Sequence, residues 1–227
     1  MLTIGLSGAT CSGKTSVARI LEKVFTHCKV INQDTFYHEE DSSNHVRDPA
    51  TSLINWEVMQ AFNMEKMYKE IDEAKESLMF NGSGLTSRMI DVVALKSLLK
   101  VQTLPPKLLD AVGRFNAITK PILVVEGITI LNDPKIFSMC DLKLFIKIDK
   151  DVCWERRKNR VWDPDGSCWE ESPGYFNAIA WPEYINIITD LEGVGGDIQY
   201  LDSNITSIED NASNIILAIS QKLESNA

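Results

Sequence analysis

The chain has 227 residues, of which 44% are hydrophobic, enough for one α/β domain with a sizeable core. Its formal net charge of −9 argues against a general binder of nucleic acids or membrane surfaces, so any surface that binds polyanions must be local. No apolar run approaches the ~18–20 residues that a membrane-spanning helix needs.

The cysteines indicate a reducing compartment. Their number is odd, and no C-x-x-C pair occurs. The first residues enter a predicted strand directly, which leaves no room for a signal peptide. We therefore expect a cytoplasmic protein with free thiols at Cys11, Cys28, Cys140, Cys153 and Cys168.

A phosphate-binding loop stands near the start of the chain. Residues 2–6 predict a short buried strand, residues 8–15 match G-x-x-x-x-G-K-[ST], and apolar residues at helical spacing follow to Val24. A chance match in a glycine-rich turn is the alternative, but strand, loop and helix come in the required order. Backbone N–H groups and the helix N-terminus would hold the phosphates of ATP, with Lys14 on the β- and γ-phosphates and the Thr15 hydroxyl on Mg²⁺. The expected ATP-binding residues here are Gly8, Ala9, Thr10, Cys11, Ser12, Gly13, Lys14, Thr15 and Ser16.

The first half of the chain continues this βαβ pattern. Residues 29–31 predict a second strand, 35–53 a polar loop, and 56–78 a helix whose methionines pack in the core. Residues 81–84 break that helix, 92–99 predict a short helix, and a loop surrounds the prolines at 105 and 106. We expect residues 80–118 to be a surface elaboration without chemistry.

The second half supplies three more strands. Residues 121–127 predict a fully buried strand, 142–148 a strand that is half-exposed or at an edge, and 198–200 a last short strand. Helices are predicted over 152–160 and 181–191, and Thr206 with Glu209 offers a capping box for a C-terminal helix. The fold class is therefore α/β, a doubly wound parallel five-stranded sheet in one domain (residues 1–227), with a lid at about 153–180.

Two carboxylates are predicted at the carboxyl edge of this sheet, where ligands of open α/β sheets bind. Asp34 follows the second strand and is a candidate to accept the proton of an attacking hydroxyl or to hold Mg²⁺ through water; a turn-forming role is the alternative. Glu126 ends the buried strand and is a candidate metal-associated acid, with a purely structural role as the alternative.

The segment before the lid is basic. Arg156, Arg157 and Arg160 would supply positive charge at the transferring phosphoryl group when the lid closes on ATP, Arg157 and Arg160 facing the site together. The alternative is a solvated basic helix paired with Glu155.

Aromatic residues flank the predicted loops on the acceptor side. Trp56 and Tyr175 are candidates to sandwich a flat ring, and Glu57, predicted to open a helix with Trp56, to bind sugar hydroxyls; surface cover is the alternative. No Asn-Lys-x-Asp segment for guanine is present, so these features favour small-molecule phosphoryl transfer over a GTPase.

The order of these motifs resembles the nicotinamide riboside kinases, a branch of the uridine kinase-like P-loop kinases. The resemblance runs from residue 2 to about 202 with a gap at about 80–118, and it is carried by residues 8–15, 31–36, 56–57, 63–67, 125–127, 156–160, 172–176 and 181–184. It implies transfer of the ATP γ-phosphate to the ribose 5′-hydroxyl of nicotinamide riboside, with Mg²⁺, in NAD biosynthesis.

The resemblance also implies roles for individual residues. Asp34 resembles the catalytic carboxylate, and Thr15 and Glu126 the metal-associated pair. Arg157 and Arg160 resemble the lid arginines. Substrate-binding positions match Asp34, Trp56, Glu57, Tyr175 and Phe176.

The chain departs from the family pattern on the acceptor side. Glu57 stands where the family has Asp, and Asn177-Ala178-Ile179 stand where its lid has Asp-Gly-His. About five extra residues lie around 166–170. A kinase of uridine, cytidine or another small nucleoside therefore stays open, as does a nucleotide-binding regulatory protein without turnover. Oligomeric state, including a homo-oligomer, is also open.

Overall fold

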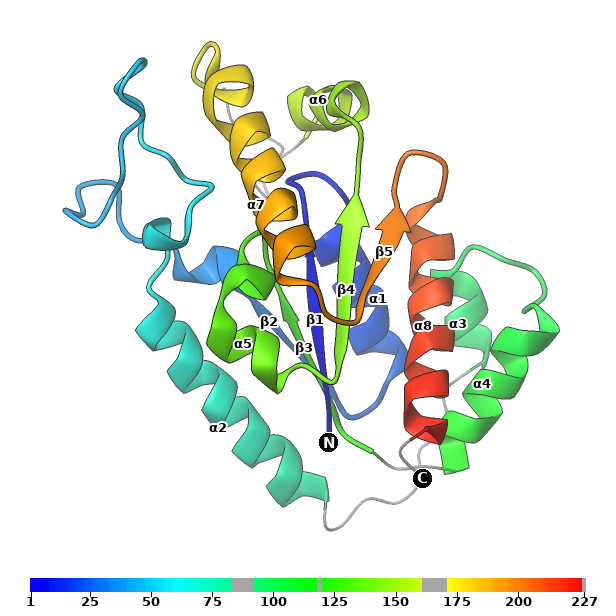
Figure 1. The fold of residues 1–227 in the computed structure, drawn as a ribbon. Helices are drawn as coiled ribbons and strands as arrows, with labels where there is room; N and C mark the ends of the chain where they lie inside the picture. Colours follow the sequence, from blue (N-terminus) through cyan, green and yellow to red (C-terminus); the bar gives the residue numbers. More distant parts are fainter. Residues whose placement is uncertain (83–91, 118–119, 161–170, 226–227) are drawn as a thin grey trace.

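Five parallel strands form one sheet in the order β2-β3-β1-β4-β5, with helices on both faces (Figure 1). The structure, a computed structural model, describes residues 1–82, 92–117, 120–160 and 171–225. The strands are β1 (Leu2–Gly8), β2 (Cys28–Asn32), β3 (Ile122–Glu126), β4 (Leu142–Lys147) and β5 (Ile198–Asp202). The predicted fold class, a doubly wound parallel sheet, is confirmed.

The register brings the strand ends to one edge. Glu126 pairs with Leu6 of β1 and with Asn32 of β2, and Gly8 pairs with Ile146 of β4. The loops that follow β1, β2 and β3 therefore leave the sheet side by side, at the point where the strand order reverses and where open α/β sheets bind ligands.

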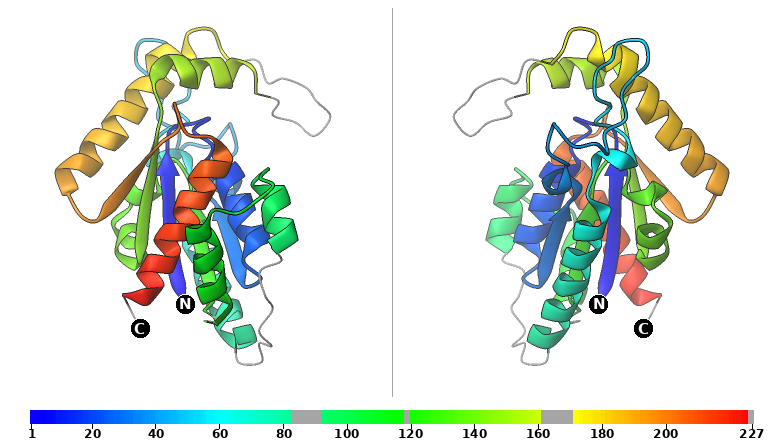
Figure 2. Two further views of the ribbon diagram at one scale, coloured as in Figure 1. Left: turned by 90° about the vertical axis from the view of Figure 1, so that its right-hand side faces the viewer. Right: turned by 90° about the vertical axis from the view of Figure 1, so that its left-hand side faces the viewer.

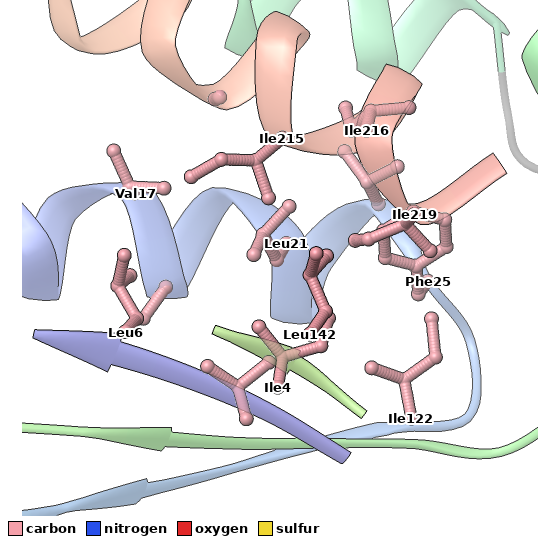
Figure 3. Close-up of a cluster of buried hydrophobic side chains, with 14 of the residues drawn as sticks. Ile4, Leu6, Val17, Leu21, Phe25, Ile122, Leu142, Ile215, Ile216 and Ile219 are labelled. Carbon is pink, nitrogen blue, oxygen red and sulfur yellow. The ribbon is translucent and has the colours of Figure 1, made fainter. Parts of the chain in front are cut away.

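One face of the sheet is covered by α1 (Lys14–Val24), α3 (Val92–Leu98), α4 (Pro106–Ala117) and α8 (Ile208–Glu224). Alternate residues of β1 point into this layer: Ile4 and Leu6 are fully buried against Val17 and Leu21 of α1 (Figure 3). Ile215 of α8 closes the cluster from above. The period of two along β1 and of 3.6 along the helices thus produces one continuous core.

The other face is covered by α2 (Met64–Gly82), α5 (Pro134–Met139) and α7 (Trp181–Val194), while α6 (Lys150–Lys158) lies over the carboxyl edge (Figures 1 and 2). Met67 and Ile71 of α2 are buried in the core as predicted, whereas Met64 is half-buried. Short 3₁₀ segments occupy Gln33–Phe36, Met59–Ala61 and Ile130–Asn132, and a π-helix, Phe176–Ala180, leads into α7. No helix in the described ranges is long and apolar enough to cross a membrane.

The helix predicted over 56–78 begins later, at Met64. The Asn63 side chain accepts the N–H of Lys66 at 3.0 Å, which caps the helix there. Upstream, the Asn55 side chain accepts the N–H of Glu57 and holds that segment in a turn. The prediction that Trp56 and Glu57 open a helix is therefore wrong, because polar capping outweighed the apolar spacing.

The segment around the two prolines is also different from the prediction. Pro106 opens α4, where a proline is tolerated because the first-turn N–H groups have no partner within the helix. Leu108, Val112 and Phe115 of α4 are buried together with Leu95 of α3. The described part of residues 80–118 is thus part of the core and not a surface elaboration.

Two smaller predictions are corrected. β4 lies between β1 and β5, so it is not an edge strand. Its two lysines, which alternate with apolar residues, have partners in the fold: Lys143 donates to the Cys140 carbonyl, and the Lys147 ammonium lies over the Tyr200 ring. The C-terminal helix is capped by Ser207, which accepts the N–H of Asp210, and not by Thr206. The extra residues predicted at about 166–170 lie outside the described residues.

Candidate active site

The phosphate loop connects β1 to α1 with backbone angles that glycine permits. Gly8 has φ +145° and Gly13 has φ +98°. A Cβ atom at Gly8 would lie 2.4 Å from the carbonyl oxygen of Ile146, so the strand next to the loop also excludes a side chain there. Both glycines of the motif are therefore required by the geometry.

Within this loop the polar groups point inward. Lys14 is buried, and its Nζ donates to the carbonyl of Ala9 at 2.8 Å, which holds the ammonium across the loop. The Ser12 hydroxyl is buried without a hydrogen-bond partner in the part of the chain that the structure describes. A buried ammonium and an unpartnered buried hydroxyl in the loop before a helix N-terminus are polar groups of the kind that bind phosphate oxygens.

The two carboxylates meet beside Lys14. Burial raises the pKa of Glu126, the Lys14 charge opposes this rise, and the Asp34 charge adds to it. The Thr15 hydroxyl hydrogen-bonds to Glu126 and also lowers its pKa. Asp34 itself is exposed in the 3₁₀ segment after β2, where its N–H is held by Asn32 at 2.8 Å.

These residues fit a magnesium ion. Glu126 Oε1 is buried and unpartnered among the described residues, and the Thr15 hydroxyl lies beside it. No group of three or more His, Cys, Asp or Glu side chains that could hold a metal occurs within the described ranges. Mg²⁺ usually takes only one or two carboxylates together with phosphate oxygens and waters, so a sparse donor set of this kind is what it needs.

Two arginines of α6 face the phosphate loop. Arg156 donates to the hydroxyl of Ser203 at 2.6 Å and to its carbonyl at 2.7 Å, and it approaches the Cys11 carbonyl at 3.5 Å. Arg157 donates to the Thr10 hydroxyl at 2.8 Å. The alternative of a solvated basic helix does not describe these two side chains; Glu155 pairs instead with Lys158.

Arg157 and Arg160 are not equivalent in the structure. The Arg157 side chain is 6% exposed and forms ion pairs with Glu57 at 3.6 Å and with Glu171. Arg160 follows the end of α6, and its backbone N–H donates to the Arg157 carbonyl. Arg156 and Arg157, adjacent residues, contact the loop; that Arg157 and Arg160 face the site together stays a prediction.

The Glu57 carboxylate lies near Arg157, Asp34 and Lys14 of the phosphate loop. Its carboxylate is buried, which raises its pKa; Arg157 lowers the pKa, Asp34 raises it, and Lys14 lowers it. Four groups predicted from distant parts of the sequence, Lys14, Asp34, Glu57 and Arg157, thus lie close enough to influence one another electrostatically.

The aromatic residues form a wall next to Glu57. The Tyr175 hydroxyl accepts the backbone N–H of Trp56 at 3.0 Å, so the two predicted ring-binding residues are joined directly. The Trp56 ring contacts the rings of Tyr37 and His45 edge-on, at 5.6 and 4.5 Å between centroids. Phe176 is 2% exposed and packs between Trp154 of α6 and Trp181 of α7, so it contributes to the packing between these two helices.

A groove of about 320 Å³ extends from Glu57 along α7. The segment 57–60 forms one wall, and Asn132, Glu183, Ile187 and Asp190 contribute to the others. Its charged lining residues are all acidic: Glu57, Asp133, Glu183 and Asp190.

Three further residues support the site and were missed by sequence reasoning. Ser203 directly follows β5, is 2% exposed, and links Arg156 to the Ser12 carbonyl, to which its hydroxyl donates at 2.9 Å. Gln33 is fully buried and exchanges hydrogen bonds with Thr129, which fixes the 3₁₀ segment that carries Asp34. For Ser203 and Gln33 a signal existed: each follows a predicted strand at the carboxyl edge, as Asp34 does.

Together, a strand, a phosphate loop, a helix and a carboxylate at the end of a neighbouring strand define a nucleoside triphosphate-binding protein with the P-loop kinase fold. A comparison with protein families identifies it further: the model of the Phosphoribulokinase / Uridine kinase family matches residues 3–191, and the chain belongs to this family.

Curated relatives are kinases of the same type. The chain is 28% identical over 221 residues to nicotinamide riboside kinase 1 of Mus musculus, which covers 97% of this chain and 95% of that protein. It is 27% identical over 199 residues to nicotinamide riboside kinase 1 of Homo sapiens, covering 88% and 82%. It is also 25% identical over 182 residues to uridine kinase of Borreliella burgdorferi (strain ZS7), covering 80% and 78%.

Proposed function

We propose that this protein transfers the γ-phosphate of ATP to the ribose 5′-hydroxyl of nicotinamide riboside and so forms nicotinamide mononucleotide for NAD biosynthesis. The observation that carries the proposal is that Arg157 contacts both Thr10 of the phosphate loop and the buried Glu57, whose carboxylate also lies within electrostatic range of Lys14 and Asp34 and next in sequence to Trp56, which Tyr175 contacts. The relatives named nicotinamide riboside kinase support the choice of acceptor.

The proposed mechanism is positioning with electrostatic stabilisation. Asp34 accepts the proton of the ribose hydroxyl as it attacks, and Lys14 holds the β- and γ-phosphates. Thr15 and Glu126 would hold Mg²⁺, which supplies positive charge to the phosphate oxygens when it is bound. Arg157 and Arg160 balance charge at the transferring phosphoryl group and help to exclude water.

On the acceptor side, Trp56 and Tyr175 are proposed to bracket the base, and Glu57 to accept hydrogen bonds from the ribose hydroxyls. Glu57 is one methylene longer than Asp and shares its carboxylate with Arg157 at 3.6 Å. The ribose hydroxyls therefore compete with a guanidinium for Glu57, and we expect a weaker apparent affinity for the nucleoside than an unshared carboxylate would give.

A second function, phosphorylation of uridine or cytidine, has support from the uridine kinase relative and from the family as a whole. We place either activity in a reducing cytoplasm, because the four cysteines within the described residues, Cys11, Cys28, Cys140 and Cys153, are free thiols.

The test is a coupled assay with Mg-ATP and a panel of nicotinamide riboside, nicotinic acid riboside, uridine and cytidine. We expect ATP consumption only with a nucleoside, and the highest kcat/KM with nicotinamide riboside. Highest kcat/KM with uridine would favour the second function, and ATP binding without any turnover would indicate a regulatory protein. Failure to form nicotinamide mononucleotide would contradict the proposal.

Asp34→Ala separates catalysis from binding in the same assay. Loss of the base should abolish turnover while ATP binding by calorimetry stays near that of the wild type, since Asp34 lies outside the phosphate loop. Asp110→Ala, an exposed change on α4, is the matched control. Full activity of Asp34→Ala would remove Asp34 from its assigned role.

A further inference from the structure

Glu171 lies where the described chain resumes after α6, and both of its carboxylate oxygens are bound. Oε2 accepts from Nε of Arg157, and Oε1 accepts the backbone N–H of Phe176 at 3.0 Å. The side chain is 13% exposed. One carboxylate therefore connects α6 to the π-helix that leads into α7.

The contact with Nε orients the whole guanidinium. An arginine head is planar and its N–H groups have fixed directions, so holding Nε determines where the two terminal nitrogens point. In the structure Nη1 points to the Thr10 hydroxyl at 2.8 Å and Nη2 to Glu57 at 3.6 Å. The Tyr175 ring, 5.7 Å from Cζ, further limits the guanidinium.

Charge makes this contact stronger than a packing contact. Arg157 and Glu171 are both largely buried, so water screens their attraction poorly. Burial lowers the pKa of Arg157, but Glu57 and then Glu171 raise it, so that the pKa lies above its ordinary value. Glu57 contacts a terminal nitrogen of the same guanidinium, Nη2. Glu171 thus holds the nitrogen next to the side-chain stem and leaves Nη1 to Thr10 and Nη2 to Glu57.

We propose that Glu171 is the positioning residue of Arg157: it fixes the guanidinium so that one terminal nitrogen faces the phosphate loop and the other faces Glu57. The inference rests on the proposed function, in which Arg157 acts at the transferring phosphoryl group. Glu171 acts through Arg157 and does not touch either substrate.

A double-mutant cycle between Glu171 and Arg157 tests this relationship. Glu171→Gln keeps an oxygen for the Phe176 N–H and removes the charge that holds Arg157. We expect kcat to fall about ten- to a hundredfold, as for a misplaced catalytic group. In an Arg157→Ala background the same change should have no further effect on kcat.

Glu155→Gln is the matched control, because it also breaks an ion pair on α6, with Lys158, but at the exposed surface. Thermal melting of every variant distinguishes a loss of the fold from a displacement of the Arg157 side chain. Equal losses of kcat with and without Arg157 would overturn the proposal, since Glu171 would then act structurally. Wild-type kcat in Glu171→Gln would overturn it as well.

The same double-mutant cycle is also measured with the affinity for a non-hydrolysable ATP analogue and Mg²⁺ as the readout. This readout needs no turnover. Coupling between the two substitutions should appear there too, because Arg157 approaches the loop through Thr10. Coupled losses of affinity in a protein that phosphorylates no nucleoside would support the positioning role and contradict only the proposed function. Additive affinities in such a protein would overturn the positioning role itself.

Discussion

Nη2 of Arg157 lies 3.6 Å from Oε1 of Glu57, and both side chains are less than one-tenth exposed. The pair joins α6 to the turn that carries Glu57. Neither charge is well hydrated, and removing Arg157 leaves Glu57 as a buried charge without its ion-pair partner, whereas Arg157 without Glu57 keeps Glu171. The nucleotide side and the acceptor side of the site are thus coupled by one ion pair.

Burial of Glu57 makes the free energy of unfolding depend on pH. The pKa of Glu57 is raised above its ordinary value of 4.5, first by burial, although Arg157 opposes the rise. Above pH 4.5 and up to the raised pKa, the folded state therefore binds more protons at this position than the unfolded chain, and the Glu57 contribution to stability falls as pH rises.

We expect Glu57→Gln to remove this dependence. The free energy of unfolding of the wild type, relative to the variant, should decrease as pH rises through the window that begins at 4.5. Urea denaturation at several pH values measures it, with Glu155→Gln as an exposed control. A difference between wild type and Glu57→Gln that is constant with pH would contradict the cited pKa shift.

Adjacent leucines on α4 test whether residues 80–118 belong to the core. Leu108 is 1% exposed and Leu109 is 48% exposed. Leu108→Ala should reduce the free energy of unfolding by about 2–5 kcal/mol through lost burial and a residual cavity. Leu109→Ala should change it by less than about 0.5 kcal/mol. Similar small values for both, by chemical denaturation, would mean that α4 is a dispensable surface element.

Two glycines offer a contrast between a required and a replaceable position. Gly8→Ala places a Cβ 2.4 Å from the Ile146 carbonyl at φ +145°, so we expect a loss of stability of at least about 1–3 kcal/mol and loss of ATP binding. Gly113→Ala, on α4 with no atom within 4 Å of the new Cβ, should gain about 0.5–1 kcal/mol. Unfolding curves and calorimetry with ATP report both effects; tight ATP binding by Gly8→Ala would be inconsistent with this loop geometry.

The thiols should differ sharply in reactivity. Burial raises the pKa of Cys140 and of Cys153 to about 12, so very little thiolate forms near neutral pH. Cys11 is half-buried in the phosphate loop and more accessible. We expect iodoacetamide to modify Cys11 before Cys140 and Cys153, and Mg-ATP to slow that modification.

Peptide mass spectrometry assigns the label to each cysteine. Cys11→Ser serves as the control, since the protection by Mg-ATP should disappear with it. Modification of Cys153 at the rate of Cys11, or no protection by Mg-ATP, would contradict the placement of Cys11 in the nucleotide site.

Local sequence patterns were enough to predict the phosphate loop and the buried strand that ends in Glu126. The phosphate loop is largely a local structure: its glycines have positive φ angles, and Lys14 donates to the Ala9 carbonyl within the loop, so the sequence motif predicts it directly. The unbroken apolar run that ends in Glu126 likewise predicts a buried parallel strand with an acid at the sheet edge, because apolar strands covered on both faces have that pattern.

Tertiary structure decided what depends on contacts between distant residues. The orientation of Arg157 toward the loop depends on Thr10, Glu57 and Glu171, and none of these three residues is within one helical turn of Arg157. Leu108 is buried because α8, formed by the last part of the chain, packs on α4. Burial and charge pairing depend on how the sheet and its helical layers assemble. The spacing of residues along the sequence therefore does not predict which distant residue will be the partner.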